Sequence, residues 1–361
     1  MVKTHPFIAL AVVMLATVGA TFAAGAAAAG GLAHARYQHL DWELSCDNTR
    51  TCYAAGYHVE EGEPTAASVL LVRKAGPGAP VSARFQVGTY GEDETAARLS
   101  KSNLLTMRIN GRVAGTVAVD RDTMIADLSR RQAEALVAAL AGKATLDWEG
   151  GGMHWSVSGK GAAAVLLKMD EFQGRLGTPG ALVRKGGRPE ALVAPALAAP
   201  VVEAALVPPA TPHKLPRDQM RLLLGELYSA TGGAECEDLA DVANGGNALT
   251  VVRLSHDRLL VSARCWAGAY NAGAGYWVVN AAPPYAPVLV TTQGTAYADG
   301  VISATHKGRG LGDCRASDEW VWDGMRFVHS AASTGGMCRL VAPGGAWHLP
   351  VLVTKVRRFG G

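Results

Sequence analysis

The chain has 361 residues, of which 49% are hydrophobic and 18% are charged, and its formal net charge is +3. This is the composition of a globular protein, and the charge is too small to indicate nucleic acid or an anionic membrane surface as a partner. About 330 residues would remain after removal of an N-terminal signal, which is too many for one ordinary core, so we expect two domains.

Residues 1–35 have the pattern of a secretory signal peptide. Lys3 precedes an uncharged apolar run that starts at Phe7 and ends at about residue 24, and small residues follow it. The small-x-Ala requirement is met at Ala23 and again at Ala35, so we expect cleavage between about residues 23 and 35. The alternative is an uncleaved membrane anchor, because the run approaches the ~20 residues that span a bilayer.

No later stretch of the sequence is long and apolar enough to span a membrane, and no cysteine closely follows the apolar run, as a lipoprotein would require. We therefore expect a periplasmic or secreted protein of the Gram-negative envelope, without a membrane span once the signal is removed.

The cysteines are expected to form structural disulfides. They are Cys46, Cys52, Cys236, Cys265, Cys314 and Cys338. None belongs to a CxxC pair or to a group with zinc-ligand spacing, so we expect no metal site. An even number in an oxidising compartment favours disulfides, although six cysteines allow fifteen connectivities. Proximity in the sequence and the division into domains favour the pairs Cys46–Cys52, Cys236–Cys265 and Cys314–Cys338.

A segment rich in proline and alanine, residues 186–214, separates two modules. It has no helical or strand period, which is typical of an extended, semi-rigid spacer. The fold class we expect is mainly β (α+β). Two antiparallel β-rich modules, residues 37–185 and 215–361, would each carry one prominent helix.

In the first module, residues 40–46 and 51–58 read as paired strands joined by the turn at residues 47–50. In that turn, polar residues such as Asp47 and Asn48 either stabilise the backbone or form a recognition loop, and we favour the first reading. Alternating patterns predict further strands at residues 67–73, 83–90, 104–109, 113–119, 144–148, 154–157 and 163–169. Ser129 and Gln132 form a capping box, which predicts a helix that stops at Gly142.

The second module opens with an apolar stripe that predicts a helix ending near Gly232. The stripe consists of Met220, Leu223, Leu224 and Leu227. Strands are expected at residues 249–254, 259–265, 274–280, 320–322 and 325–329, and Asp323-Gly324 predicts a hairpin turn between the last two.

The run Leu40–Cys52, which reads LDWELSCDNTRTC, resembles the opening of the bacterial family catalogued as domain of unknown function 1176. Later motifs resemble the closing motifs of that family, namely Gly312-Asp313-Cys314, residues 319–324, Phe327, Cys338-Arg339 and residues 347–350. The first module is also distantly similar to the invasion-associated locus B proteins. In that comparison residues 133–140 match a helix, residues 165–167 a strand and Phe172 a short turn. The resemblance implies an envelope or periplasmic protein and supplies no activity, cofactor or catalytic residues.

Motifs of familiar enzymes are absent from the sequence, which has no G-x-S-x-G elbow, no H-E-x-x-H, no P-loop and no dinucleotide fingerprint after a strand. A nucleophile hypothesis would use Ser333 or Thr334, beside glycines, with His329 or His348 as the base. A plain loop before Cys338 explains the same residues. We expect no cofactor and lean against an enzyme.

Aromatic residues gather in the second module and offer a candidate binding surface. Trp320 and Trp322 stand two apart on one predicted strand and would share a face, and Trp347-His348 follows later. An exposed face of this kind holds carbohydrates or peptides by stacking. In the alternative, which we favour for these rings, they fill a β core. We expect a binding or accessory protein that contacts an envelope protein or a glycan. The rivals are an envelope hydrolase with a non-standard site and a structural or stress-protective protein.

Overall fold

The computed structural model describes residues 34–59, 65–90, 93–232, 235–240 and 248–358. The expected signal peptide lies almost entirely outside these residues. The segment Ala33–Gly361 forms one compact unit. The described part is built mainly from antiparallel strands, so the predicted mainly β fold is confirmed. No helix in the described ranges is long and apolar enough to cross a membrane.

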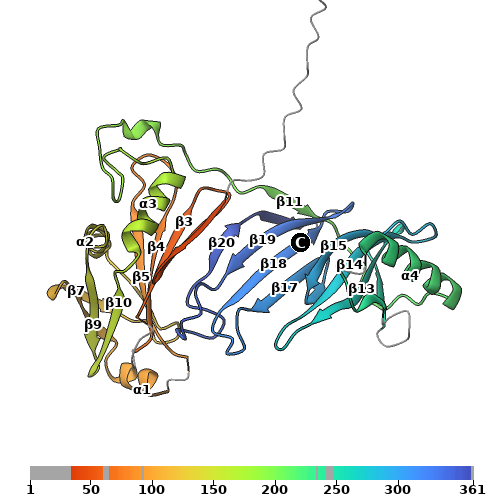
Figure 1. Ribbon diagram of the computed structural model, residues 1–361, viewed down its shortest axis with the longest axis horizontal. Helices are drawn as coiled ribbons and strands as arrows, with labels where there is room; N and C mark the ends of the chain where they lie inside the picture. Colours follow the sequence, from red (N-terminus) through yellow and green to blue (C-terminus); the bar gives the residue numbers. More distant parts are fainter. Residues whose placement is uncertain (1–33, 60–64, 91–92, 233–234, 241–247, 359–361) are drawn as a thin grey trace, which may run out of the picture. The chain divides into compact units, whose positions relative to one another are not determined.

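Two antiparallel sheets and three helices make up the N-terminal half (Figure 1). A six-stranded sheet has the order β1 (Ala35–His39), β2 (Trp42–Cys46), β3 (Cys52–Tyr57), β4 (Ala67–Arg73), β5 (Val81–Val87) and β8 (Ile125–Asp127). A four-stranded sheet has the order β10 (Met153–Ser158), β9 (Thr145–Gly150), β6 (Leu104–Ile109) and β7 (Arg112–Ala118). The helices are α1 (Asp93–Lys101), α2 (Arg130–Leu140) and α3 (Ala162–Phe172).

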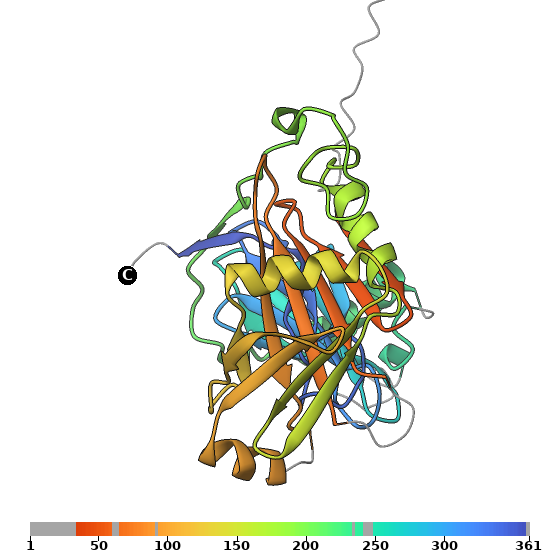
Figure 2. The ribbon, with the colours of Figure 1, turned by 90° about the vertical axis from the view of Figure 1, so that its left-hand side faces the viewer.

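One continuous core fills the space between these two sheets and the helices. Phe85 and Trp148, one from each sheet, stack with ring centroids 4.1 Å apart. Helix α2 lies across the strands of the larger sheet (Figure 2), and its start is the predicted capping box of Ser129 and Gln132. The larger sheet therefore has one face covered by this core, which leaves its other face for a second partner.

Helix α3 corrects one prediction, because residues 163–169 were expected to be a strand. Its buried residues Ala162, Val165, Leu166 and Met169 repeat with helical spacing. Alanine, leucine and methionine also have high helix propensity, so the alternation seen in a short window was misleading. The strand that the locus B comparison placed at residues 165–167 is thus part of a helix.

The C-terminal half contains two further antiparallel sheets and helix α4 (Arg217–Thr231), which ends at Gly232 as predicted. One sheet has the order β12 (Thr250–Arg253), β13 (Arg258–Ala267), β14 (Ala272–Asn280) and β15 (Val288–Gly294). The other has the order β16 (Ala296–Ala298), β17 (Val301–Lys307), β18 (Arg315–Trp322), β19 (Phe327–Thr334) and β20 (Leu349–Leu352). Helix α4 lies beside the first of these sheets (Figure 1). Its residues Leu223 and Leu227 belong to one buried cluster with Trp277 of β14.

The proline-rich segment between the halves is docked along most of its length. It contains a short 3-10 turn (Glu190–Leu192) and strand β11 (Val201–Ala204), which pairs in parallel with β21 (Lys355–Arg358). Glu190 forms an ion pair with Arg175 at 3.0 Å, and the guanidinium of Arg175 is fully buried. Backbone pairing with β21 and the ion pair with the buried Arg175 therefore hold parts of this segment against both halves.

The two halves meet where a loop of the C-terminal half covers the second face of the larger N-terminal sheet. Trp347 and Leu349 belong to a buried cluster with Tyr57 and Leu70 of that sheet. The indole nitrogen of Trp347 donates a hydrogen bond of 2.7 Å to the hydroxyl of Ser68. The turn at residues 47–50, which the Cys46–Cys52 disulfide closes, also contacts the C-terminal half. The Asn48 side-chain amide donates to the Val353 carbonyl and accepts from the Val353 N–H.

Candidate functional site

The tryptophans considered as a candidate binding surface are mostly buried. Trp322 is 1% exposed and Trp347 is 6% exposed. Trp320 is half-buried against the same core as Trp322, and its ring stacks on His329 at 5.0 Å. His348 is exposed, but its neighbour Trp347 points into the contact between the halves. The prediction that Trp320 and Trp322 share a face agrees with this packing, but the face is largely core and does not form an open platform.

The nucleophile hypothesis has no matching arrangement among the described residues. The imidazole of His329 is 2.9 Å from the carboxylate of Asp318. Ser333 is the register partner of Ser317, the neighbour of Asp318, so it points to the opposite face of the sheet. Ser333 and Thr334 form no hydrogen bond with His329 or His348 in the described part of the chain.

A polar groove of about 480 Å³ lies where β1 and β2 face the ends of β17, β18 and β19. One wall is the β1–β2 pair, in which Arg36 and Gln38 face the same side as their register partners Ser45 and Glu43. The opposite wall consists of His306, Lys307, Gly308, Arg315, Ala316 and Thr334. The Cys314–Cys338 disulfide and residues 336–337 close the groove at its base.

Glu43 lies in this groove and holds the two walls together. Its Oε1 atom accepts hydrogen bonds of 2.6 Å from the Tyr57 hydroxyl and 2.6 Å from the Met337 backbone N–H. Burial raises the pKa of Glu43, and the two hydrogen bonds and the charge of Arg36 only partly oppose this effect. The carboxyl group is therefore committed to internal contacts, and it ties β2 to the segment that follows β19.

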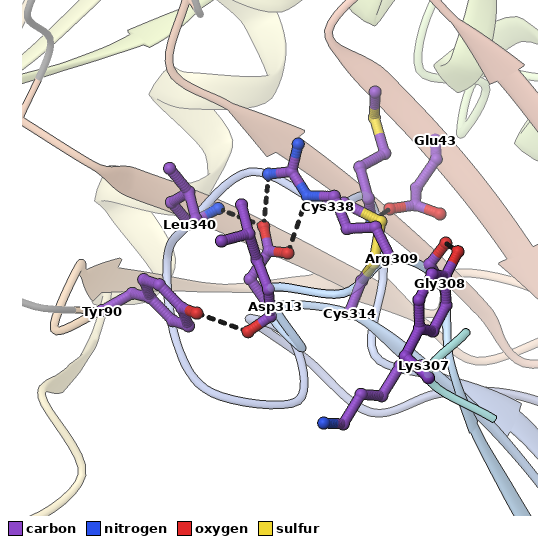
Figure 3. The surroundings of a disulfide bond; sticks show 12 residues. Glu43, Tyr90, Lys307, Gly308, Arg309, Asp313, Cys314, Cys338 and Leu340 are labelled. Atoms are coloured by element: carbon purple, nitrogen blue, oxygen red, sulfur yellow. Dashed lines mark hydrogen bonds and ion pairs between the residues drawn. A yellow bond between two sulfur atoms is a disulfide. The ribbon is translucent and has the colours of Figure 1, made fainter.

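The disulfide at the base is supported by a buried carboxylate (Figure 3). Asp313 accepts two hydrogen bonds from the Arg309 guanidinium, at 2.8 and 2.7 Å, and one of 2.8 Å from the Leu340 N–H. The hydrogen bonds from Arg309 contribute most to lowering the pKa of Asp313. The Tyr90 hydroxyl donates to the Leu311 carbonyl in the same loop.

Asp313, Cys314 and Cys338 place three potential metal-ligand atoms within 4.8 Å of one another. The two sulfur atoms are bonded to each other, and the carboxylate of Asp313 is already paired with Arg309. This group therefore holds the loop in place as a structural clamp.

The structure contains two more disulfides, Cys46–Cys52 and Cys236–Cys265, and all three are the pairs that proximity favours.

The groove has an excess of positive charge. Arg36, Lys307 and Arg315 line it and are exposed, and none of them forms an ion pair with a carboxylate of the described residues. Glu43 is the one carboxylate among the described lining residues, and its acceptor oxygen is occupied by internal donors. Exposed cations without partners around a concave surface form an attractive potential for an anion.

Sequence reasoning did not find this groove. Its walls come from residues 36–45 and 306–338, and no local pattern relates them. The resemblance motifs include Glu43 and the Asp313-Cys314 and Cys338-Arg339 pairs, but local patterns indicate only a strand around Glu43 and a disulfide for the two cysteines. A carboxylate at the second position of a strand whose other residues are buried is the one available signal for Glu43.

The match with a protein family covers residues 36–354, which is nearly all of the described chain. The chain belongs to the family described as protein of unknown function (DUF1176). It is 28% identical over 312 residues to the uncharacterized protein YpfG of Escherichia coli (strain K12), covering 80% of this chain and 84% of that protein. No solved structure matches the chain.

Proposed function

We propose that this DUF1176 protein is exported to the bacterial envelope, where it acts by binding an anionic partner, a protein or a glycan, in the groove between β1–β2 and β17–β19. The observation that carries the proposal is a set of exposed cations around a polar depression, Arg36, Lys307 and Arg315, which form no ion pair with a carboxylate of the described residues. A binding role needs a preformed concave surface with a few polar groups, and this groove meets that requirement.

Export is supported by the N-terminal pattern of Lys3, an apolar run and small residues. The three disulfides support an oxidising destination, because cytosolic thiols are kept reduced. Distant kinship of the N-terminal half with the invasion-associated locus B proteins is part of the same proposal. Those proteins start with a strand pair that carries a Trp and two Cys, as Trp42, Cys46 and Cys52 do here. The proposed kinship depends on this opening and on α2, because residues 165–167 lie in a helix and do not form the matching strand.

The binding proposal is tested by isothermal titration of the purified protein with polyglutamate, polygalacturonate, neutral dextran and polylysine. We expect an anionic polymer to bind and Arg315→Glu to weaken its binding about tenfold at low ionic strength, because the substitution removes one attraction and adds one repulsion. The matched control is Arg121→Glu, which changes the same charge at an exposed turn away from the groove.

Anionic polymers that bind no better than dextran would contradict the proposal. It would also fail if a hydrolase screen found turnover that disappears in Ser333→Ala or His348→Ala, because the protein would then be the envelope hydrolase considered above.

A further inference from the structure

We propose that the ligand of the groove is an extended acidic polypeptide segment that adds to the sheet as a strand along β1. This inference rests on the proposed binding function and narrows its anionic partner to one class. Three features of the groove carry it, namely a free sheet edge, the sign of its charge and the lack of an exposed aromatic face.

Strand β1 is an outer strand of the six-stranded sheet and pairs only with β2 among the described residues. Its backbone forms no other backbone hydrogen bond within the described part of the chain. A free edge offers N–H and C=O groups that an extended peptide can pair with, and this mode of recognition is common. The other outer strand, β8, contributes no residue to the groove.

The positive charges around the groove indicate that such a peptide carries acidic side chains. Arg36 lies on β1, while Lys307 and Arg315 lie on the opposite wall, so an added strand would have cations on both sides. Side chains of a strand alternate between two faces, so acidic residues at every second position of the ligand would all face the groove. The five residues of β1 span roughly 16 Å, which sets a ligand of about six residues.

A glycan is less well matched to the same surface. Sugar rings are held by exposed aromatic faces, and the described lining of the groove includes one aromatic residue of this kind, Tyr37. That ring packs partly against the N-terminal core and lies 5.9 Å from the Lys168 ammonium. Trp347 and Trp322 are buried elsewhere and offer no stacking surface to the groove.

The experiment measures fluorescence anisotropy of a labelled peptide with alternating valine and glutamate, six residues long, on the purified protein. We expect saturable binding, a loss of about tenfold in affinity for Arg36→Glu and for Arg315→Glu, and no loss for Arg121→Glu. Two analogues carry N-methyl groups at the odd or at the even positions, which keeps the charges and blocks one edge of the peptide in each. The analogue blocked on the edge that pairs with β1 should bind at least about tenfold more weakly. Thermal melts verify that each variant is folded.

Each outcome decides between the possibilities. If the plain peptide and both N-methylated analogues bind equally well, strand addition is overturned. Binding of polygalacturonate without binding of the acidic peptide overturns the polypeptide class but leaves the groove as an anion site. Binding of neither, with groove variants identical to wild type, overturns the proposed function as well. Light scattering tests whether the protein forms a dimer through β1. A dimer that is lost in Gln38→Glu, which adds a charge to β1, would show that a second copy occupies the edge, and it would overturn the proposal.

Discussion

Ser68 and Trp347 are 279 residues apart in the sequence, yet a hydrogen bond of 2.7 Å joins the Ser68 hydroxyl to the indole nitrogen of Trp347. Ser68 in turn donates to the Gly56 carbonyl at 2.8 Å, and Arg84 lies 5.3 Å from the centre of the Trp347 ring. One side chain from the C-terminal half is thereby fixed on a strand of the N-terminal sheet. The contact joins the N-terminal half, which carries the β1–β2 wall of the groove, to the C-terminal half, which carries the opposite wall.

The first prediction concerns this pair. Ser68→Ala should reduce the free energy of unfolding by about 1–3 kcal/mol, because it leaves the buried indole N–H without an acceptor. Trp347→Phe removes the donor, and the double variant should show a coupling energy of about 1 kcal/mol in a double-mutant cycle from urea unfolding. Strictly additive single effects would contradict a direct bond. Ser229→Ala, at an exposed helix position, is the control and should change stability by less than about 0.5 kcal/mol.

A second prediction follows from Glu43. Burial raises its pKa above the ordinary value of 4.5, so the folded chain binds this proton more tightly than the unfolded chain does. The corresponding stability is fully present below pH 4.5 and is lost as the pH rises through the raised pKa. Glu43→Gln keeps an oxygen acceptor for Tyr57 and Met337 but does not ionise. The variant should therefore gain stability relative to wild type as the pH increases from 4 to 8.

Urea unfolding at several pH values measures this difference. Glu134→Gln, which makes the same substitution at an exposed position of α2, serves as the control. The account of Glu43 is wrong if its variant loses stability relative to wild type as the pH rises.

The third prediction ranks two disulfides. Cys314–Cys338 closes a loop with a sequence separation of 24, against 6 for Cys46–Cys52. Loop-closure entropy gives about 3.5 kcal/mol for the longer loop and about 2 kcal/mol for the shorter one. Cys314→Ala/Cys338→Ala should accordingly cost more in guanidinium unfolding than Cys46→Ala/Cys52→Ala. The reverse order would show that strain or residual structure outweighs the loop entropy.

Asp313 supplies a fourth prediction. Its side chain is fully buried and paired with Arg309, so Asp313→Asn should destabilise the protein by about 3 kcal/mol. Because its pKa is lowered in the folded chain, the stability due to this carboxylate is present above pH 3.8 and is lost as the pH falls through the lowered pKa. Asp257→Asn, whose side chain is 84% exposed, is the matched control and should be close to neutral in thermal unfolding. A similar small effect at both positions would contradict the clamp.

Local patterns were sufficient to predict many of the strands. The strands at residues 67–73 and 104–109 begin and end at the predicted residues, and the capping box at Ser129 starts α2 as expected. These features depend on side-chain alternation and on hydrogen bonds within a few residues, which a sequence contains directly. Helix α3 was not predicted because a short apolar run has no clear period. The helix propensities of its residues have to be considered as well.

The groove could not be predicted from the same information. Glu43 contacts Met337 across 294 residues, and the walls are set by contacts of this range rather than by neighbouring residues. The sequence left the burial of the tryptophans open for a related reason. A Trp at alternate strand positions reads the same whether its face is open or covered, and only the packing of the second half on Ser68 and Leu70 decides that Trp347 is covered.

The most direct test of the central claim is a charge exchange between the groove and its ligand. The double variant Arg36→Glu/Arg315→Glu is titrated with the valine–glutamate peptide and with a valine–lysine peptide of equal length. The account predicts that the wild type prefers the glutamate peptide and that the double variant reverses the preference. An unchanged preference for the glutamate peptide in the folded double variant would show that the groove is not the binding site.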